Sequence, residues 1–178
     1  VERPLRLTFE ITEERIAALE HEKAFKNLAA SRKKGEAGRR EAEEGQDVQE
    51  AVLQVLSDMV SEEVCTNRDA FNELLDEAFA GVGVMLRAPV RKAILNALSE
   101  SSDDAEVCLD KDGDPESDPN LRDTENVPLL EDVGYYFERE VAPHVPDAWI
   151  NEDVRDPKDG GVGRVGYEIN FNRYFYVY

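Results

Sequence analysis

The chain has 178 residues, of which 41% are apolar, so it can bury the core of one ordinary domain with an appended segment. Its net charge of −19 repels phosphate and argues against nucleic-acid binding by most of the surface. The chain lacks an apolar run near the ~18 residues that a membrane helix needs, and Val1 is not followed by a signal-peptide pattern. Two cysteines without a CxxC motif and two histidines argue against a disulfide framework or zinc site. We therefore expect a cytoplasmic protein without membrane contact.

The charge is unevenly distributed along the chain. Residues 1–42 carry ten Lys/Arg and eight Asp/Glu and are slightly basic. Residues 100–159 carry five Lys/Arg and twenty Asp/Glu and are strongly acidic. Any contact with phosphate is therefore expected near the N-terminal end.

The first elements are an extended segment and a helix. Residues 2–10 alternate apolar and polar side chains, which predicts a half-buried strand or extended arm. Thr12 is a suitable N-cap, and an amphipathic pattern predicts a helix from there to about residue 31.

Residues 32–45 are rich in glycine and charge, which predicts a flexible linker or exposed loop. This segment contains the basic residues Arg32, Lys33, Lys34, Arg39 and Arg40. A solvated loop is the favoured interpretation. The alternative is a mobile arm that contacts phosphate without reading bases.

Three further helices are predicted between residues 46 and 100. The first covers about 46–63, by the helical spacing of its apolar residues. Asn67 caps the second, which stops at Gly81 and Gly83, and Pro89 opens the third. Their apolar stripes are interpreted as core.

The remaining chain is loop, one helix and an extended end. Residues 100–128 are dense in Asp, Pro and Ser and predict an acidic loop, with 107–109 as a short extended piece. A fifth helix is predicted over about 130–141, with Leu130, Val133, Phe137 and Val141 on its buried side. Trp149 and Ile150 are expected to pack back onto the core, and the pattern of residues 165–178 predicts a strand or extended chain.

The predicted fold is mainly α: a small helical domain of about five helices, long acidic loops and an extended aromatic C-terminal segment. The predicted organisation is an N-terminal arm, helix and basic linker (1–45), followed by a helical domain (46–178).

Two motifs partly match known binding motifs but lack the residues or flanking elements that those motifs require. The aspartates that begin at Asp110 suggest a calcium loop, but Pro115 and Leu121 stand where an EF-hand needs glycine and glutamate. Residues 161–166 spell GxGxxG, but the motif needs a strand before it and a helix after it, which the flanking patterns do not predict. No catalytic, cofactor-binding or metal-binding residue is therefore assigned.

Two stretches resemble a known family. Residues 122–149 (RDTENVPLLEDVGYYFEREVAPHVPDAW) and 166–176 (GYEINFNRYFY) resemble the region near the end of type I restriction-modification DNA methyltransferase subunits that methylate adenine N6. Residues 4–29 (PLRLTFEITEERIAALEHEKAFKNLA) are similar to the segment that follows the catalytic domain of those proteins.

The resemblance implies a non-catalytic C-terminal module. The parent enzyme would bind S-adenosylmethionine, assemble with specificity and restriction subunits, and modify DNA. The family's Asn-Pro-Pro-Phe/Tyr motif and its cofactor loop do not occur here, so no functional residue is carried over. Two other hypotheses are an acidic DNA mimic that inhibits nucleic-acid enzymes and, more remotely, a calcium-dependent adaptor.

Overall fold

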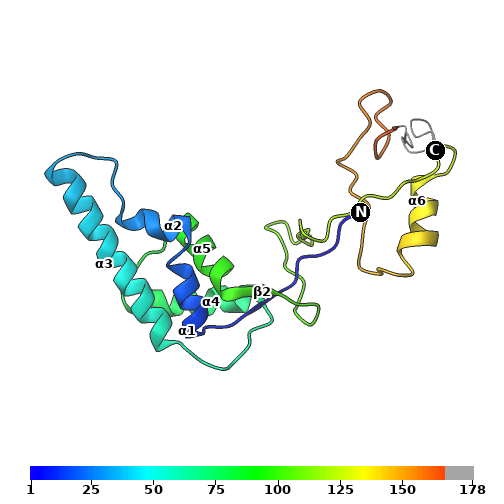
Figure 1. Ribbon diagram of the computed structural model, residues 1–178. Helices are drawn as coiled ribbons and strands as arrows, with labels where there is room; N and C mark the ends of the chain where they lie inside the picture. Colours follow the sequence, from blue (N-terminus) through cyan, green and yellow to red (C-terminus); the bar gives the residue numbers. More distant parts are fainter. Residues whose placement is uncertain (167–178) are drawn as a thin grey trace, which may run out of the picture. The chain divides into compact units, whose positions relative to one another are not determined.

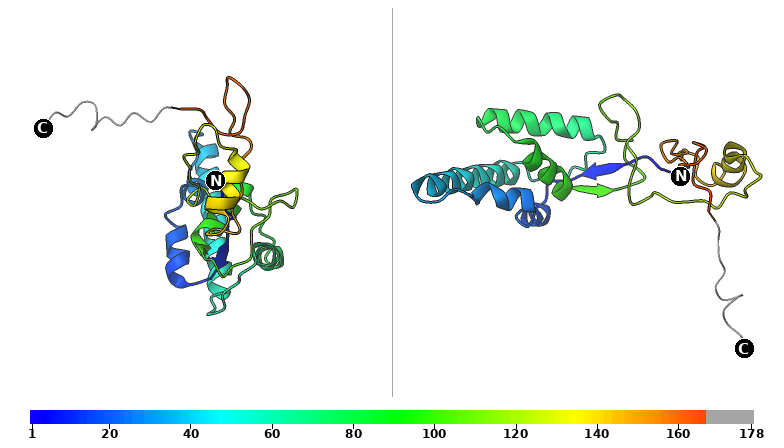
Figure 2. Two further views of the ribbon diagram at one scale, coloured as in Figure 1. Left: turned by 90° about the vertical axis from the view of Figure 1, so that its right-hand side faces the viewer. Right: turned by 90° about the horizontal axis from the view of Figure 1, so that it is seen from above.

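The computed structural model describes residues 1–166 and confirms a mainly helical fold (Figures 1 and 2). The chain forms two compact units. Unit 1 contains Val1–Pro4 and the chain from Ser117 onward, and unit 2 contains Leu5–Glu116. The predicted division after residue 45 falls inside a helix, whereas the two units meet in sequence at residues 4/5 and 116/117.

Unit 2 opens with the predicted strand. β1 (Leu7–Phe9) pairs antiparallel with β2 (Ser99–Ser101), with Leu7 opposite Ser101. The residues of β2 were not predicted as a strand, because a serine-rich tripeptide has no apolar alternation. The short extended piece at 107–109 is confirmed, since Arg6 bridges Val107 and the Cys108 N–H donates to the Leu5 carbonyl.

The predicted continuous helix over 12–31 is wrong. Thr12 does cap α1 (Glu13–Leu19), but the chain then turns and continues as α2 (Lys23–Lys26) and the 3-10 turn η1 (Asn27–Ala29). Leu19 and Phe25 are both buried. In an unbroken helix they would point about 120° apart. The break allows both side chains to enter one core.

The linker predicted over 32–45 is wrong for most of its length. α3 (Glu36–Asp58) begins within that segment and continues through it. Its glycines are packing positions: Gly38 and Gly45 are buried, and they lie against the backbone of Lys33 and Leu28. A glycine that permits close approach and a glycine that permits flexibility look identical in sequence.

The next two helices agree with their sequence signals. α4 (Arg68–Gly81) is capped by Asn67, whose side chain accepts from the N–H groups of Asp69 and Ala70. α5 (Ala88–Leu98) has Pro89 in its first turn. The core of unit 2 is formed by apolar side chains from β1, the segment after it and α1 to α5, namely Phe9, Ile11, Ile16, Leu19, Phe25, Val52, Val55, Leu56, Phe71, Leu75, Phe79, Val90, Ala93, Ile94 and Leu98.

Unit 1 is held together mainly by polar interactions. Glu2 bridges Trp149 and Pro4 bridges Ser117. Trp149 is only half-buried within unit 1. Among the described residues of unit 1, Val141 is the only buried large hydrophobic side chain, whereas Glu2, Asp118 and Asp156 are all buried.

The fifth predicted helix is shorter than expected. It consists of α6 (Val133–Tyr136) and the π-turn η2 (Phe137–Val141), and Leu130 lies outside it. Leu130 was expected on a buried face, yet it is 99% exposed. The predicted extended segment at 165–178 lies mostly outside the described residues.

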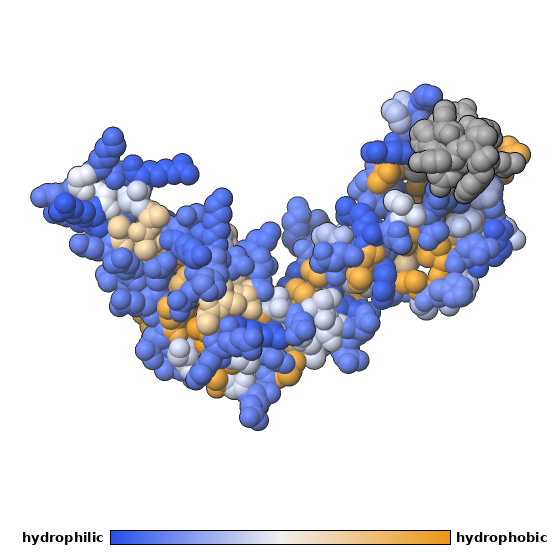
Figure 3. Space-filling model, in the orientation of Figure 1, coloured by the Kyte–Doolittle hydropathy of each residue, from blue (hydrophilic) through white to orange (hydrophobic). Residues whose placement is uncertain are grey.

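Over residues 1–166, no helix combines the length and apolar character needed to cross a bilayer. The face of the molecule in Figure 3 is mostly hydrophilic, with smaller hydrophobic areas between the charged side chains.

Candidate nucleic-acid interface

The basic cluster, defined as Arg32, Lys33, Lys34, Arg39 and Arg40, lies around the start of α3. Three of its members are in the connection from η1 to α3, and two are in the first turns of the helix. All five side chains are exposed. Gly35 makes the turn into α3 with φ 73°, a conformation that other residues rarely adopt.

The connection that carries the cluster is anchored to α3. The Ser31 hydroxyl donates to the Glu41 carboxylate and also accepts from the Lys33 N–H. The Lys33 ammonium lies 3.5 Å from the other Glu41 oxygen. The Ser31 hydrogen bond, followed by the charge of Lys33, lowers the pKa of Glu41. Lys33 is therefore paired with Glu41, and the connection from η1 to α3 is held against the helix.

The other four members of the cluster are available for contact. Within residues 1–166, Arg32, Lys34, Arg39 and Arg40 form no ion pair. Residues 32–44 nevertheless contain four glutamates beside the five basic residues, so the local charge is close to neutral. Such a surface can make individual phosphate contacts but not a strong general field.

A groove of about 820 Å³ lies beside the cluster. Lys33 lines it from the connection before α3 and Arg40 from the first turns of α3. Met85, Leu86 and Arg87 line it from the connection between α4 and α5. Glu36, Glu41 and Glu44 contribute the opposite charge. The groove was not predicted from the sequence, in which the apolar residues between α4 and α5 are its only sign.

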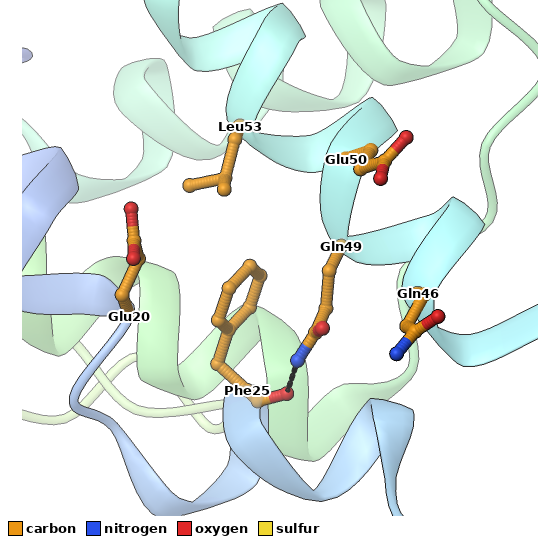
Figure 4. A pocket seen from close by; sticks show the side chains of 6 residues that line it. All are labelled: Glu20, Phe25, Gln46, Gln49, Glu50 and Leu53. Carbon is orange, nitrogen blue, oxygen red and sulfur yellow. Dashed lines mark hydrogen bonds between the residues drawn. The ribbon is translucent and has the colours of Figure 1, made fainter. Parts of the chain in front are cut away.

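A smaller hollow of about 440 Å³ lies between α2 and α3 (Figure 4). The Gln49 amide donates to the Phe25 carbonyl across it at 2.7 Å, and Glu20, Gln46, Glu50 and Leu53 complete its lining. The Gln49 amide satisfies a carbonyl near the end of α2, which makes it a structural contact. The hollow brings together no acid–base pair or nucleophile.

The aspartate turn at 110–114 is closed by the carboxylate of Asp110. Asp110 Oδ1 accepts from the N–H groups of Asp112 (2.8 Å) and Asp114 (3.0 Å), and Gly113 adopts φ 89°. Arg68 closes the turn by donating to the Glu116 carboxylate and the Leu109 carbonyl. Over residues 1–166, no group of three or more His, Cys, Asp or Glu could hold a metal ion.

The glycine-rich segment 161–166 is folded around a carboxylate. Asp156 accepts from the N–H groups of Lys158 (2.8 Å) and Val165 (2.9 Å), and Arg155 bridges Val162. A phosphate would have to displace a negative charge from these donors. The residues of this segment therefore do not fit the phosphate of a nucleotide.

Acidification should release this segment. The two backbone donors lower the pKa of Asp156, so its folded pKa lies below the usual 3.8. The resulting stabilisation is present above the unfolded pKa and is lost as the pH falls through the folded pKa. The amide shifts of Lys158 and Val165 should titrate together with a midpoint below 3.8 in NMR spectra. Asp156→Asn should abolish that titration, and its persistence in the variant would contradict the assignment.

The cysteines do not form a reactive pair. Both are free: Cys108 is buried, and burial raises the pKa of its thiol. The Cys65 thiol donates to the Asn67 carbonyl. A raised pKa lowers the thiolate fraction, which makes Cys108 a poor nucleophile.

Comparison of the chain with protein-family models, with curated proteins and with solved structures found no match. The assignment of a function therefore depends on the residues themselves.

Neutralising the available members of the basic cluster tests whether the cluster contacts phosphate. If the cluster binds phosphate, the logarithm of the association constant for duplex DNA falls linearly with the logarithm of the salt concentration. Each lost phosphate contact should make this slope shallower by up to about 0.9. The four substitutions to test singly are Arg32→Gln, Lys34→Gln, Arg39→Gln and Arg40→Gln. Fluorescence anisotropy with labelled duplex DNA at several salt concentrations measures that slope. Lys33→Gln is the matched control and should change the slope less, because Lys33 is paired with Glu41. An unchanged slope in all four variants would show that the cluster does not bind phosphate.

Proposed function

We propose that this chain is a non-catalytic module of a type I restriction-modification adenine-N6 DNA methyltransferase subunit. In this role it supports assembly with the specificity and restriction subunits, and DNA modification by the parent enzyme in the cytoplasm. The observation that carries the proposal is the long stretch 122–149, with 166–176 and 4–29, that resembles those subunits.

The distribution of the resembling stretches supports a module that acts as a whole. The stretch 122–149 belongs to unit 1, whereas 4–29 begins in unit 1 at Pro4 and supplies β1, α1, α2 and η1 of unit 2. A likeness restricted to one unit would suit a shared short motif. A likeness in both units is what a common region of a larger protein would give.

The chemistry of the described residues supports a supporting role. The glycine-rich segment is occupied by the Asp156 carboxylate, and the basic cluster offers phosphate contact without base reading. The resemblance implies that S-adenosylmethionine binding and base flipping are tasks of the parent's catalytic domain.

The reading frame upstream of Val1 gives a direct test. We expect it to encode an Asn-Pro-Pro-Phe/Tyr motif, and an upstream frame without that motif would overturn the proposal. A biochemical test compares the parent subunit with a variant that lacks residues 1–178. Calorimetry should show S-adenosylmethionine binding by both, whereas size-exclusion chromatography should show loss of assembly only for the deletion. Cofactor binding by the isolated chain would contradict the assigned roles.

A second candidate, an acidic DNA mimic, is favoured by the net charge of −19. It requires carboxylates that face solvent, whereas Asp118 and Asp156 are buried and bound to backbone N–H groups. The mimic predicts salt-sensitive inhibition of a DNA enzyme by the chain. Absence of inhibition at low salt would exclude it.

A further inference from the structure

Two adjacent leucines in unit 1 project into solvent. Leu129 is 77% exposed and Leu130 is 99% exposed, and they lie in the turn that precedes α6. Among residues 1–166, Leu130 is the most exposed large hydrophobic side chain. We refer to these two residues as the leucine pair. Single exposed leucines are ordinary, but an adjacent pair at this exposure marks a candidate contact surface.

The turn that bears the leucine pair is held in place. The Glu131 N–H donates to the Pro128 carbonyl at 2.9 Å, and the Glu131 carboxylate forms an ion pair with Arg139 of η2. The Arg139 guanidinium lies 5.4 Å from the Tyr135 ring centroid and 5.7 Å from that of Tyr136. The leucine pair is therefore presented from a fixed turn, which reduces the entropy lost on binding.

The described residues of unit 1 form no core around the leucine pair. Val141 is the only buried large hydrophobic among its described residues, while Val133 and Phe137 are half-buried beside it. The Arg139–Glu131 ion pair keeps the turn in its present position. Burial of the leucine pair against an apolar surface would remove it from water, which favours docking.

The charge around the leucine pair favours one class of binding partner. Residues 122–140 contain six Asp/Glu and two Arg. Both arginines are already paired, Arg122 with Glu2 and Arg139 with Glu131 and Glu140. The exposed excess is negative, so it repels nucleic acid, anionic lipid and a second copy of the same surface, and it attracts cationic side chains.

We propose that the leucine pair docks onto an apolar surface of a partner protein that is bordered by lysines and arginines. The two leucines supply the apolar anchor, and the surrounding carboxylates orient the partner and accelerate association. This docking role is independent of the proposed parent enzyme.

A synthetic amphipathic helix with a leucine stripe flanked by lysines has the chemistry of the proposed partner. Labelled with a fluorophore, it should bind the full chain in anisotropy titrations. The double variant Leu129→Ser/Leu130→Ser should bind about 10-fold or more weakly, because each leucine burial contributes at least that factor. Leu121→Ser, at a position 37% exposed in the same unit, is the matched control and should bind as the unaltered chain does.

The Arg139→Gln substitution tests whether the ion pair that holds the turn contributes to binding. It leaves both leucines in place but removes the ion pair to Glu131, so it should weaken binding several-fold. Circular dichroism checks the fold of every variant, and the double variant should match the unaltered chain since Leu130 makes almost no contact within unit 1.

Four results would overturn the proposal. Equal affinity of the double variant and the unaltered chain would show binding by charge alone. Equal binding of a helix in which glutamates replace the lysines would remove the charge argument. Leucine-dependent binding to vesicles of anionic phospholipid would make a membrane the occupant. Leucine-dependent dimerisation in sedimentation experiments would make it a second copy.

Discussion

Replacing Phe9 with alanine is expected to lower the free energy of unfolding of unit 2 by about 3–5 kcal/mol. Phe9 is fully buried, and its ring stacks on that of Phe71 with centroids 4.6 Å apart. Its backbone also exchanges hydrogen bonds with Cys65, at 2.8 and 2.9 Å. The substitution would leave a cavity where β1 meets α4, and the surrounding backbone is too constrained to fill it.

Urea denaturation followed by circular dichroism measures this loss. Val82→Ala is the control, because Val82 is 57% exposed and its truncation should change the midpoint very little. A Phe9→Ala midpoint equal to that of the control would mean that the Phe9–Phe71 contact is not central to the core.

The Gly45→Ala substitution is expected to destabilise unit 2 by about 2–3 kcal/mol, despite the higher helix propensity of alanine. A Cβ at Gly45 would overlap the Leu28 carbonyl and also meet the Ala29 Cα. Both are backbone atoms, so relief requires η1 to move away from α3. That movement would also disturb the groove lined by Leu28, Gly45 and Val48.

Gly81→Ala provides the matched control for this glycine. Gly81 is the last residue of α4, and a Cβ there would have no atom within 4 Å. It should be neutral or slightly stabilising. Thermal unfolding should therefore separate the two variants by several degrees. If the Gly45→Ala and Gly81→Ala variants have the same melting temperature, the close packing of α3 on η1 is not required for stability.

The sequence was most informative where a local signal determines a local structure. The Asn67 side chain and the Pro89 ring each act within their own helical turn, so the starts of α4 and α5 could be predicted. The C-terminal end of the first helix could not, because the break near His21 reflects the burial of Leu19 and Phe25 in a core built by other elements. Likewise, only the approach of η1 reveals that Gly45 is a packing residue.

The residues of the candidate site could be identified from the sequence, but the contacts between them could not. The basic cluster can be read from residues 32–40, whereas the pairing of Lys33 with Glu41 depends on α3 beginning at Glu36. The leucine pair shows the same limit. Leu130 fits the apolar period of the following helix, but α6 begins only after the Asp132 cap, and Leu130 is left in the preceding turn.

Some of the aspartates in turns could lose their charge while the turn keeps its backbone conformation. Asp110, Asp118 and Asp132 each cap backbone N–H groups through a single carboxylate oxygen, Oδ1. The amide oxygen of asparagine could accept the same bonds, so each position could lose a negative charge while the turn persists. Asp156 differs, since it uses both oxygens. Drift between Asp and Asn at the exposed positions Asp110 and Asp132 could therefore change attraction to partners without remodelling the backbone.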